Sequence, residues 1–143
     1  MRILKSIYTN ISNASIVSGG STITQQYAKN VFLSNKQTLQ RKLKELILSL
    51  QMEMQYSKEQ ILEGYINSIY YGHGIYGFKN AASFYFNKDI NSLTIAEIAV
   101  LIAIPNGPSY YSPILNMENA KSKRNQILYV LYQNNLISED EYD

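Results

Sequence analysis

The sequence predicts a mainly α-helical domain. Three capping boxes, each a Ser or Thr followed three positions later by Glu or Gln, begin at Thr22, Ser57 and Thr94, and such boxes mark helix starts. Apolar residues recur at helical spacing between residues 38 and 56, and no segment alternates apolar and polar residues as a strand does. The 143 residues, 45% of them hydrophobic, suffice for one domain with a core.

We expect six helices, separated by turns that contain Gly and Pro. The expected helices span residues 22–33, 38–56, 58–69, 76–86, 94–104 and 117–134. The turn sequences are YYGHGIYG, from residue 70, and PNGPSYYSP, from residue 105. Near the end of the chain Ser138 is suited to cap a further helix, because three acidic residues follow it in the favourable first turn.

The helix expected at residues 38–56 carries a polar strip between two apolar faces, and we define this polar strip as Arg41, Lys42, Glu45 and Ser49. On an ideal helical wheel the larger apolar face contains Leu39, Leu43, Leu46, Ile47, Leu50 and Met54, and Leu48 and Met52 lie nearly opposite. We therefore expect burial on two sides, with the polar strip lining a cleft. The alternative is a solvated row of ion pairs, and both interpretations stay open at this point.

The stretch GGSTITQQYAKN, residues 19–30, has the features of an anion site. Its two glycines allow close approach of the backbone, and the helix that follows presents free N–H groups and the positive end of its dipole. Lys29 adds a positive charge, while the amides of Gln25, Gln26 and Asn30 suit sugar hydroxyls. The alternative is that Thr22 only caps the helix and the other side chains are solvated.

Composition narrows the classes of function. The formal net charge is only +2, so bulk electrostatics do not indicate nucleic acid as a partner. The absence of cysteine excludes disulfides and thiolate zinc sites. No apolar run approaches the roughly 20 residues that cross a bilayer, and polar residues interrupt the start of the chain, so we expect neither a signal peptide nor an anchor within this sequence.

The stretch GGSTITQQYAKN resembles the second signature motif of the family 51 glycosyltransferases, the peptidoglycan polymerases of penicillin-binding proteins and their monofunctional relatives. Other motifs follow in the family's order: RKLKE at residues 41–45 is similar to the third, KEQILEGYIN at 58–67 to the fourth and KRNQIL at 123–128 to the fifth. The segments YYGHGIYGFKNAASFYF and PNGPSYYSP are also similar to family sequences. The resemblance therefore extends over nearly the whole chain.

The resemblance implies a lysozyme-like helical fold and the polymerisation of lipid II into glycan strands, with inversion at the anomeric carbon and release of polyprenyl pyrophosphate. It implies that Glu45 is the second catalytic glutamate, which assists near the leaving pyrophosphate. It further implies that polar and cationic residues bind the substrate: Thr22, Gln25, Gln26, Lys29, Asn30, Arg41 and Lys42. Four residues of the later motifs are expected to support the cleft: Glu63, Tyr65, Asn67 and Arg124.

The chain departs from the family pattern at its start. The family's first motif, which carries the catalytic base, is absent, and no Asp or Glu precedes Glu45. We therefore interpret residues 1–143 as a single partial glycosyltransferase domain, with 1–18 a remnant of the jaw region, and expect it to be inactive alone. Gln37 and Lys123 stand where relatives commonly carry arginine, although Lys36 lies beside the former. His73, in a Gly-rich turn, is expected to have a structural or hydrogen-bonding role.

The resemblance also implies partners and a location. The partners are lipid II, the growing glycan strand, the membrane surface and other cell-wall synthesis proteins, at the outer face of the cytoplasmic membrane. No cofactor is evident and no metal-ligand cluster is legible, although relatives can respond to divalent metal. Two alternative functions remain: a non-enzymatic module that binds a lipid-linked glycan or a cell-wall partner, and a helical interaction domain that docks on an acidic partner through residues 121–124.

Overall fold

The computed structural model describes residues 22–33 and 38–142, which form helices, turns and one isolated β-bridge. The α-helices are α2 (Ile23–Phe32), α3 (Leu39–Gln55), α4 (Lys58–Ser68), α5 (Phe78–Phe86), α6 (Ile95–Ala103), α7 (Met117–Gln133) and α8 (Glu139–Tyr142), and the 3-10 helices are η1 (Ile90–Ser92) and η2 (Ile104–Asn106). The mainly α-helical fold class is thus confirmed. Within these residues no helix combines the length and apolar character needed to cross a bilayer.

Capping side chains explain where the helices begin. Five helices follow a Ser or Thr whose hydroxyl accepts a hydrogen bond from a backbone N–H in the first turn. These N-cap residues are Thr22, Thr38, Ser57, Thr94 and Ser138. The capping boxes of α4 and α6 are reciprocal, because Gln60 and Glu97 accept hydrogen bonds in return. Each cap satisfies an N–H that has no partner inside the helix, so the expected starts of these helices lie within one residue of the observed ones.

Helix α5 begins two residues later than the expected start at residue 76. Tyr76 instead forms an antiparallel bridge with Tyr70, and the two rings lie 5.0 Å apart. Gly77 precedes the helix with a φ of +83°, and a Cβ at this position would lie 2.7 Å from the carbonyl oxygen of Asn67. This conformation and this close approach both require glycine. The helix therefore starts only after the chain has turned at Gly77.

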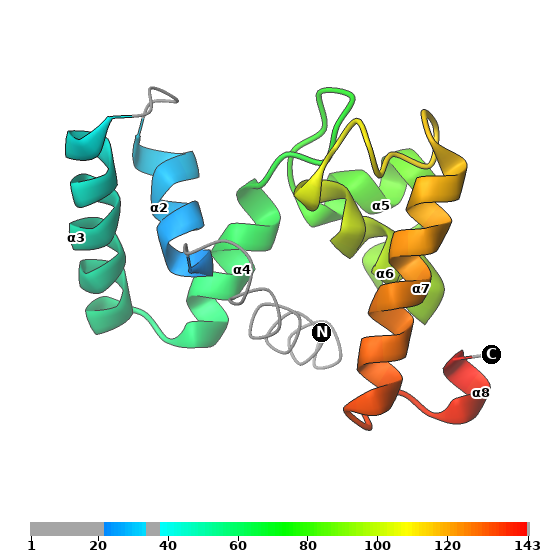
Figure 1. The fold of residues 1–143 in the computed structure, drawn as a ribbon. Coiled ribbons are helices and arrows are strands. Elements are labelled where there is room, and N and C mark those ends of the chain that lie inside the picture. Colours follow the sequence, from blue (N-terminus) through cyan, green and yellow to red (C-terminus); the bar gives the residue numbers. More distant parts are fainter. Residues whose placement is uncertain (1–21, 34–37, 143) are drawn as a thin grey trace.

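The helices form two groups that α4 connects (Figure 1). On one side α2 packs against α3 and α4, around a small cluster of buried side chains, Ala28, Met52 and Ile61. On the other side α6 packs against α7, and the main core includes the fully buried side chains of Tyr71, Leu101, Ile104 and Leu131. Helix α4 contributes Ile61 to the small cluster and Leu62 and Tyr65 to the main core, and its C-cap residue Ile69 also belongs to the main core.

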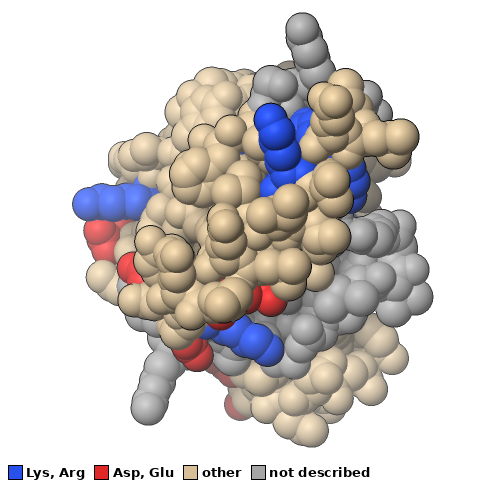
Figure 2. All heavy atoms as spheres, turned by 90° about the vertical axis from the view of Figure 1, so that its left-hand side faces the viewer, with Lys and Arg blue, Asp and Glu red and all other residues tan. Residues whose placement is uncertain are grey.

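The expectation that α3 is buried on two sides is wrong. Its larger apolar face is exposed, and the exposed fraction of each residue ranges from 43% at Leu46 to 92% at Leu39. Glu45 and Ser49 of the polar strip are buried instead, together with Met52. The helical wheel separated the apolar and polar faces of α3 correctly. However, α2 packs against α3 on the side of the polar strip and not on the larger apolar face. In Figure 2, which shows the molecule from the side where α3 lies, uncharged residues accordingly dominate the surface.

Candidate functional site

The polar strip of α3 places a carboxylate in the interior of the protein. Glu45 is only 2% exposed, and the Nζ atom of the half-exposed Lys42, one turn earlier, lies 2.9 Å from its Oε2 atom. Ser49, one turn later, is also buried, and its hydroxyl donates to the carbonyl of Leu46 at 2.8 Å. Burial of a carboxylate is costly unless it is paired and hydrogen-bonded. The ion pair with Lys42 supplies part of that compensation.

Two buried polar atoms of the polar strip have no hydrogen-bond partner among the described residues: Nε of Arg41 and Oε2 of Glu45. The ion pair of Oε2 with Lys42 is therefore close in distance but not aligned as a hydrogen bond. Buried polar groups in proteins are almost always hydrogen-bonded, and those that are not often mark sites of binding or catalysis. The donor of Arg41 and the acceptor of Glu45 thus point to a polar ligand at this face of α3.

Helix α2 supplies amides and a cation beside this face. Thr22 caps the helix by accepting a hydrogen bond from the N–H of Gln25 at 3.2 Å, so capping is its observed role. Gln26 accepts a hydrogen bond from the hydroxyl of Tyr65 at 3.0 Å. Lys29 is half-buried, whereas Asn30 is exposed at the end of the same helix. Because α2 packs against α3, its side chains and those of the polar strip belong to one part of the molecule.

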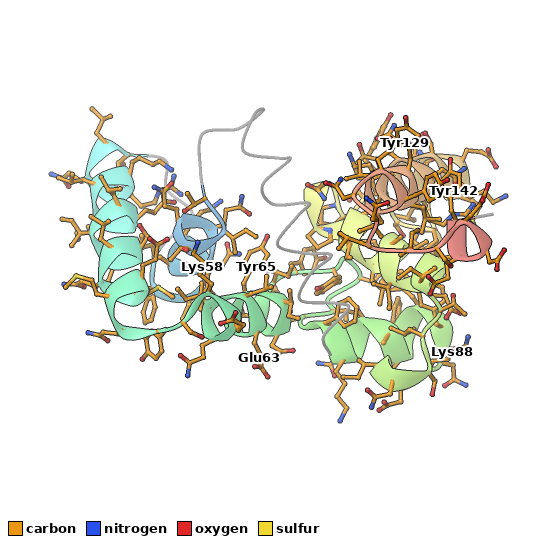
Figure 3. The ribbon with its side chains drawn as sticks, turned by 90° about the horizontal axis from the view of Figure 1, so that it is seen from below. Lys58, Glu63, Tyr65, Lys88, Tyr129 and Tyr142 are labelled. Atoms are coloured by element: carbon orange, nitrogen blue, oxygen red, sulfur yellow. The ribbon has the colours of Figure 1, made fainter. Side chains whose placement is uncertain are left out.

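The expected supporting residues lie in different places. Tyr65 is buried on the side of α4 toward α2, whereas Glu63 lies exposed on the other side of the same helix (Figure 3). Asn67 is also exposed, and its carbonyl oxygen is the group that Gly77 approaches. Of these three residues, Tyr65 alone has a described side-chain hydrogen bond to a residue of the expected binding set. The structure therefore joins the second and fourth motifs through the pair of Tyr65 and Gln26.

Arg124 lies on α7, which belongs to the other group of helices from α3 (Figure 1). Its Nε and Nη2 atoms donate to the side-chain oxygen of Asn125 at 3.0 and 2.8 Å. It also lines a cavity of about 420 Å³, whose walls are Ala96, Arg124, Asn125, Leu128, Glu141 and Tyr142. Lys123, its neighbour, lies over the ring of Tyr111, with 5.9 Å between Nζ and the ring centroid. The described contacts of these two residues of the fifth motif are therefore with other residues of α7 and with the segments packed beside it.

His73 has the hydrogen-bonding role expected of it. Its Nε2 atom lies 3.1 Å from the hydroxyl of the fully buried Ser112, so it connects the two turns that contain Gly and Pro. The ring also lies 5.5 Å from that of Phe84. Burial raises the pKa of the nearby Tyr85 hydroxyl, and a hydrogen bond with Ser112 opposes that effect. These contacts bind the turns to α5.

In the described ranges, no three His, Asp or Glu side chains gather closely enough to hold a metal ion. The carboxylate of the polar strip already faces an ammonium group. What the polar strip and α2 do combine is a buried carboxylate, three cationic side chains and several amides, which suits a ligand that is anionic at one end and rich in hydroxyls at the other.

Some expectations lie outside the described residues. They concern the glycines at 19 and 20, the assignment of residues 1–18 to a remnant of the jaw region, and the substitution at Gln37 with Lys36 beside it. The sequence reasoning also missed one contact, the packing of Tyr27 against Gly64. Its signal was an isolated glycine within a helical pattern, which often has a packing reason.

Comparison with known proteins gives consistent matches. A family model described as Transglycosylase matches residues 1–132. Penicillin-binding protein 1F of Bacillus subtilis (strain 168) is 47% identical over 137 residues, which are 96% of this chain and 19% of that protein. Penicillin-binding protein 1A of Neisseria lactamica is 44% identical over 141 residues, which are 99% of this chain and 18% of that protein. The chain thus spans less than a fifth of the length of these relatives.

A solved structure is similar in fold. The crystal structure of penicillin-binding protein 1A from Haemophilus influenzae superimposes with a TM-score of 0.54 at 26% sequence identity. The match covers 85% of this chain and 15% of that one. The similarity in fold therefore includes most of the helices described above.

Proposed function

The chain belongs to the transglycosylase family, and from this premise we propose that it takes part in polymerising lipid II into glycan strands, with release of polyprenyl pyrophosphate. The resemblance seen in the ordered motifs is confirmed by the family model and the relatives. In this proposal the ligands are lipid II and the growing glycan strand, at the outer face of the cytoplasmic membrane, where other cell-wall synthesis proteins are further partners.

The observation that carries the proposal is the buried carboxylate of Glu45 beside cationic side chains. Lys42 lies 2.9 Å from this carboxylate, and Arg41 retains a buried N–H donor without a described partner. Pyrophosphate oxygens would accept a hydrogen bond from that donor and would be attracted by the charges of Lys42 and Lys29. Proteins commonly bind phosphate through such charge-assisted hydrogen bonds. The amides of Gln25, Gln26 and Asn30, with the hydroxyl of Thr22, would bind the sugar hydroxyls.

In the proposed reaction one bond forms, one bond breaks and one proton is transferred. The hydroxyl oxygen of the acceptor sugar forms a bond to the anomeric carbon of the donor, and the bond from that carbon to the pyrophosphate breaks. The hydroxyl proton passes to the carboxylate base that the resemblance assigns to the family's first motif, and the pyrophosphate leaves with the electron pair of its bond. The cationic side chains stabilise the charge that develops on the leaving pyrophosphate, while Glu45 assists near it.

A second candidate function is binding without turnover. It is favoured by one observation: no acidic residue precedes Glu45 in this sequence, whereas the resemblance implies a catalytic base in a motif before residue 19. In this case the chain holds a lipid-linked glycan and does not polymerise it. Loss of a general base typically lowers a rate by about 10² to 10⁴, so we propose that this chain alone binds the substrate and turns it over slowly or not at all.

Binding of a fluorescent lipid II analogue in mild detergent tests both candidates. We expect Lys29→Ala and Lys42→Ala to weaken binding by about tenfold, because a charge-assisted contact is worth roughly 1.5–3 kcal/mol and 1.4 kcal/mol corresponds to tenfold in affinity. Lys44→Ala is the matched control on α3, since Lys44 is exposed and lies on another side of the helix from Lys42. It should change the affinity less than about twofold.

Glu45→Gln separates binding from chemistry in the same assay. The amide has the shape of the carboxylate, so we expect the variant to bind the analogue. In a preparation in which the unsubstituted chain makes glycan strands, we expect the variant to make none. Glu53→Gln, an exposed carboxylate on the same helix, is its control. Absence of saturable binding by a folded chain would overturn both candidate functions, and equal losses with Lys44→Ala and Lys42→Ala would show that the polar strip is not the site.

A further inference from the structure

Helix α4 contains a glycine, Gly64, whose missing side chain makes room for Tyr27 of α2. A Cβ at this position would lie 2.7 Å from Cζ and 2.8 Å from Cε1 of the Tyr27 ring, and the hydroxyl oxygen is nearer still. Atoms of two side chains do not approach so closely, so even alanine would push the ring away. Glycine weakens a helix interior, and here that weakness is offset by the close approach of a large aromatic ring.

A second contact lies directly beside the first. Tyr65, the residue after Gly64, donates its hydroxyl proton to Oε1 of Gln26, the residue before Tyr27, at 3.0 Å. Two adjacent residues of α4 thus contact two adjacent residues of α2. The aromatic contact limits how closely the helices approach, and the hydrogen bond fixes their rotation relative to each other.

Helix α3 is tied to the same contact. Tyr27 and Leu48 pack against the small cluster of Ala28, Met52 and Ile61, which includes one residue from each of α2, α3 and α4. Met52 lies on the same side of α3 as Glu45, since both are buried there. A shift of α2 on α4 would therefore change the distance from Gln26 and Lys29 to the polar strip.

We propose that Tyr27, Gly64 and Tyr65 are positioning residues, which set α2 against α3 and orient the Gln26 amide for the ligand of the polar strip. The hydroxyl of Tyr65 donates to the side-chain oxygen of Gln26. This hydrogen bond orients the amide, so that its NH₂ group can donate to the ligand. The claim about the ligand rests on the proposed function, whereas the claim about the position of α2 does not.

The position of α2 is tested without any ligand by nuclear Overhauser contacts between the Gln26 side-chain amide and the Tyr65 ring. We expect these contacts in the unsubstituted chain, their loss in Gly64→Ala, and their return in Tyr27→Leu/Gly64→Ala. Leucine restores them because it lacks the three atoms of Tyr27 nearest to the added Cβ, which are the hydroxyl oxygen and two ring carbons. Contacts that persist in Gly64→Ala, or that the double variant does not restore, would overturn the proposal.

Affinity for the fluorescent lipid II analogue tests the consequence for the site. Gly64→Ala and Tyr65→Phe should weaken binding about threefold to tenfold, and Tyr27→Leu/Gly64→Ala should restore it to within about twofold of the unsubstituted chain. Tyr129→Phe is the control for Tyr65→Phe, because it makes the same change on the exposed surface of α7. A dispersed amide spectrum for each variant confirms that it is folded.

The outcomes separate this proposal from the proposed function. If the unsubstituted chain binds the analogue and Tyr65→Phe binds equally well, the positioning role is wrong and the proposed function stands. If the unsubstituted chain does not bind, the proposed function fails, and the Overhauser contacts still decide whether Gly64 and Tyr27 position Gln26.

Discussion

At the scale of single residues, Glu45 shows how a binding site can oppose stability. Its carboxylate is almost completely buried, and one of its oxygens has no hydrogen bond within the described ranges. Removing a carboxylate from water costs more than removing a neutral amide of the same shape. The energetic cost is understandable if the side chain is retained for its chemistry, because binding and catalytic groups are often locally unfavourable for folding.

We therefore predict that Glu45→Gln does not destabilise the chain. The free energy of unfolding should stay unchanged or rise by up to about 1 kcal/mol, which corresponds to a rise of roughly 2–4 °C in the melting temperature for a domain of this size. Urea denaturation at pH 7 measures the change, with Glu53→Gln as the exposed control. A loss of stability greater than that of the control would mean that the Lys42 pair stabilises the fold.

At the scale of elements, the helix starts are built from local hydrogen bonds, and α6 is the clearest case. Glu97 completes the capping box with Thr94 and also accepts hydrogen bonds from Lys88 at 2.8 and 3.0 Å. Partial burial by itself would raise the pKa of Glu97. The hydrogen bonds from Lys88 and Thr94, together with the charge of Lys88, outweigh that effect and hold the pKa below its ordinary value of 4.5.

This lowered pKa predicts a pH dependence of stability. Because the folded state holds the Glu97 carboxylate charged, its contribution is present above the ordinary pKa and is lost as the pH falls through the lowered one. Glu97→Gln keeps an oxygen for the cap but removes the charge. Urea denaturation should show Glu97→Gln less stable at pH 7, by a few tenths of a kcal/mol to about 1 kcal/mol, with the difference vanishing in acid. A difference that does not shrink as the pH falls below the ordinary pKa of 4.5 would contradict this account.

At the scale of the whole molecule, the two groups of helices differ in how completely they are packed. The main core encloses α6 between its neighbours. The small cluster joins α2, α3 and α4 through few side chains, and the larger apolar face of α3 stays exposed. An exposed apolar face of this kind contributes little to folding, and it favours association with other apolar surfaces.

We predict that replacing two residues of that face leaves the fold intact. Leu43→Gln and Leu50→Gln should each change the free energy of unfolding by less than about 0.5 kcal/mol, because both side chains are already exposed and Gln forms helices well. Ile61→Ala, in the small cluster, should cost roughly 2–5 kcal/mol by contrast. Denaturation curves of the three variants, with solubility measured in parallel, check the prediction; a large loss in Leu43→Gln would show that this face is covered in solution.

Features that depend on neighbours a few positions apart could be predicted from the sequence. Capping side chains act across three residues, so the starts of α2, α3, α4 and α6 could be predicted. The ordered motifs identified the family and nominated Glu45 and Lys29. The roles assigned to these residues within the site remain predictions.

The tertiary structure decided what depends on residues distant along the chain. The late start of α5 results from the approach of Gly77 to Asn67, and the hydrogen bond from Tyr65 to Gln26 spans 39 positions. The wheel of α3 described its faces but not which of them α2 would cover. The periodicity of apolar residues describes only the faces of one helix. Which face is buried depends on where the connecting turns place the neighbouring helices.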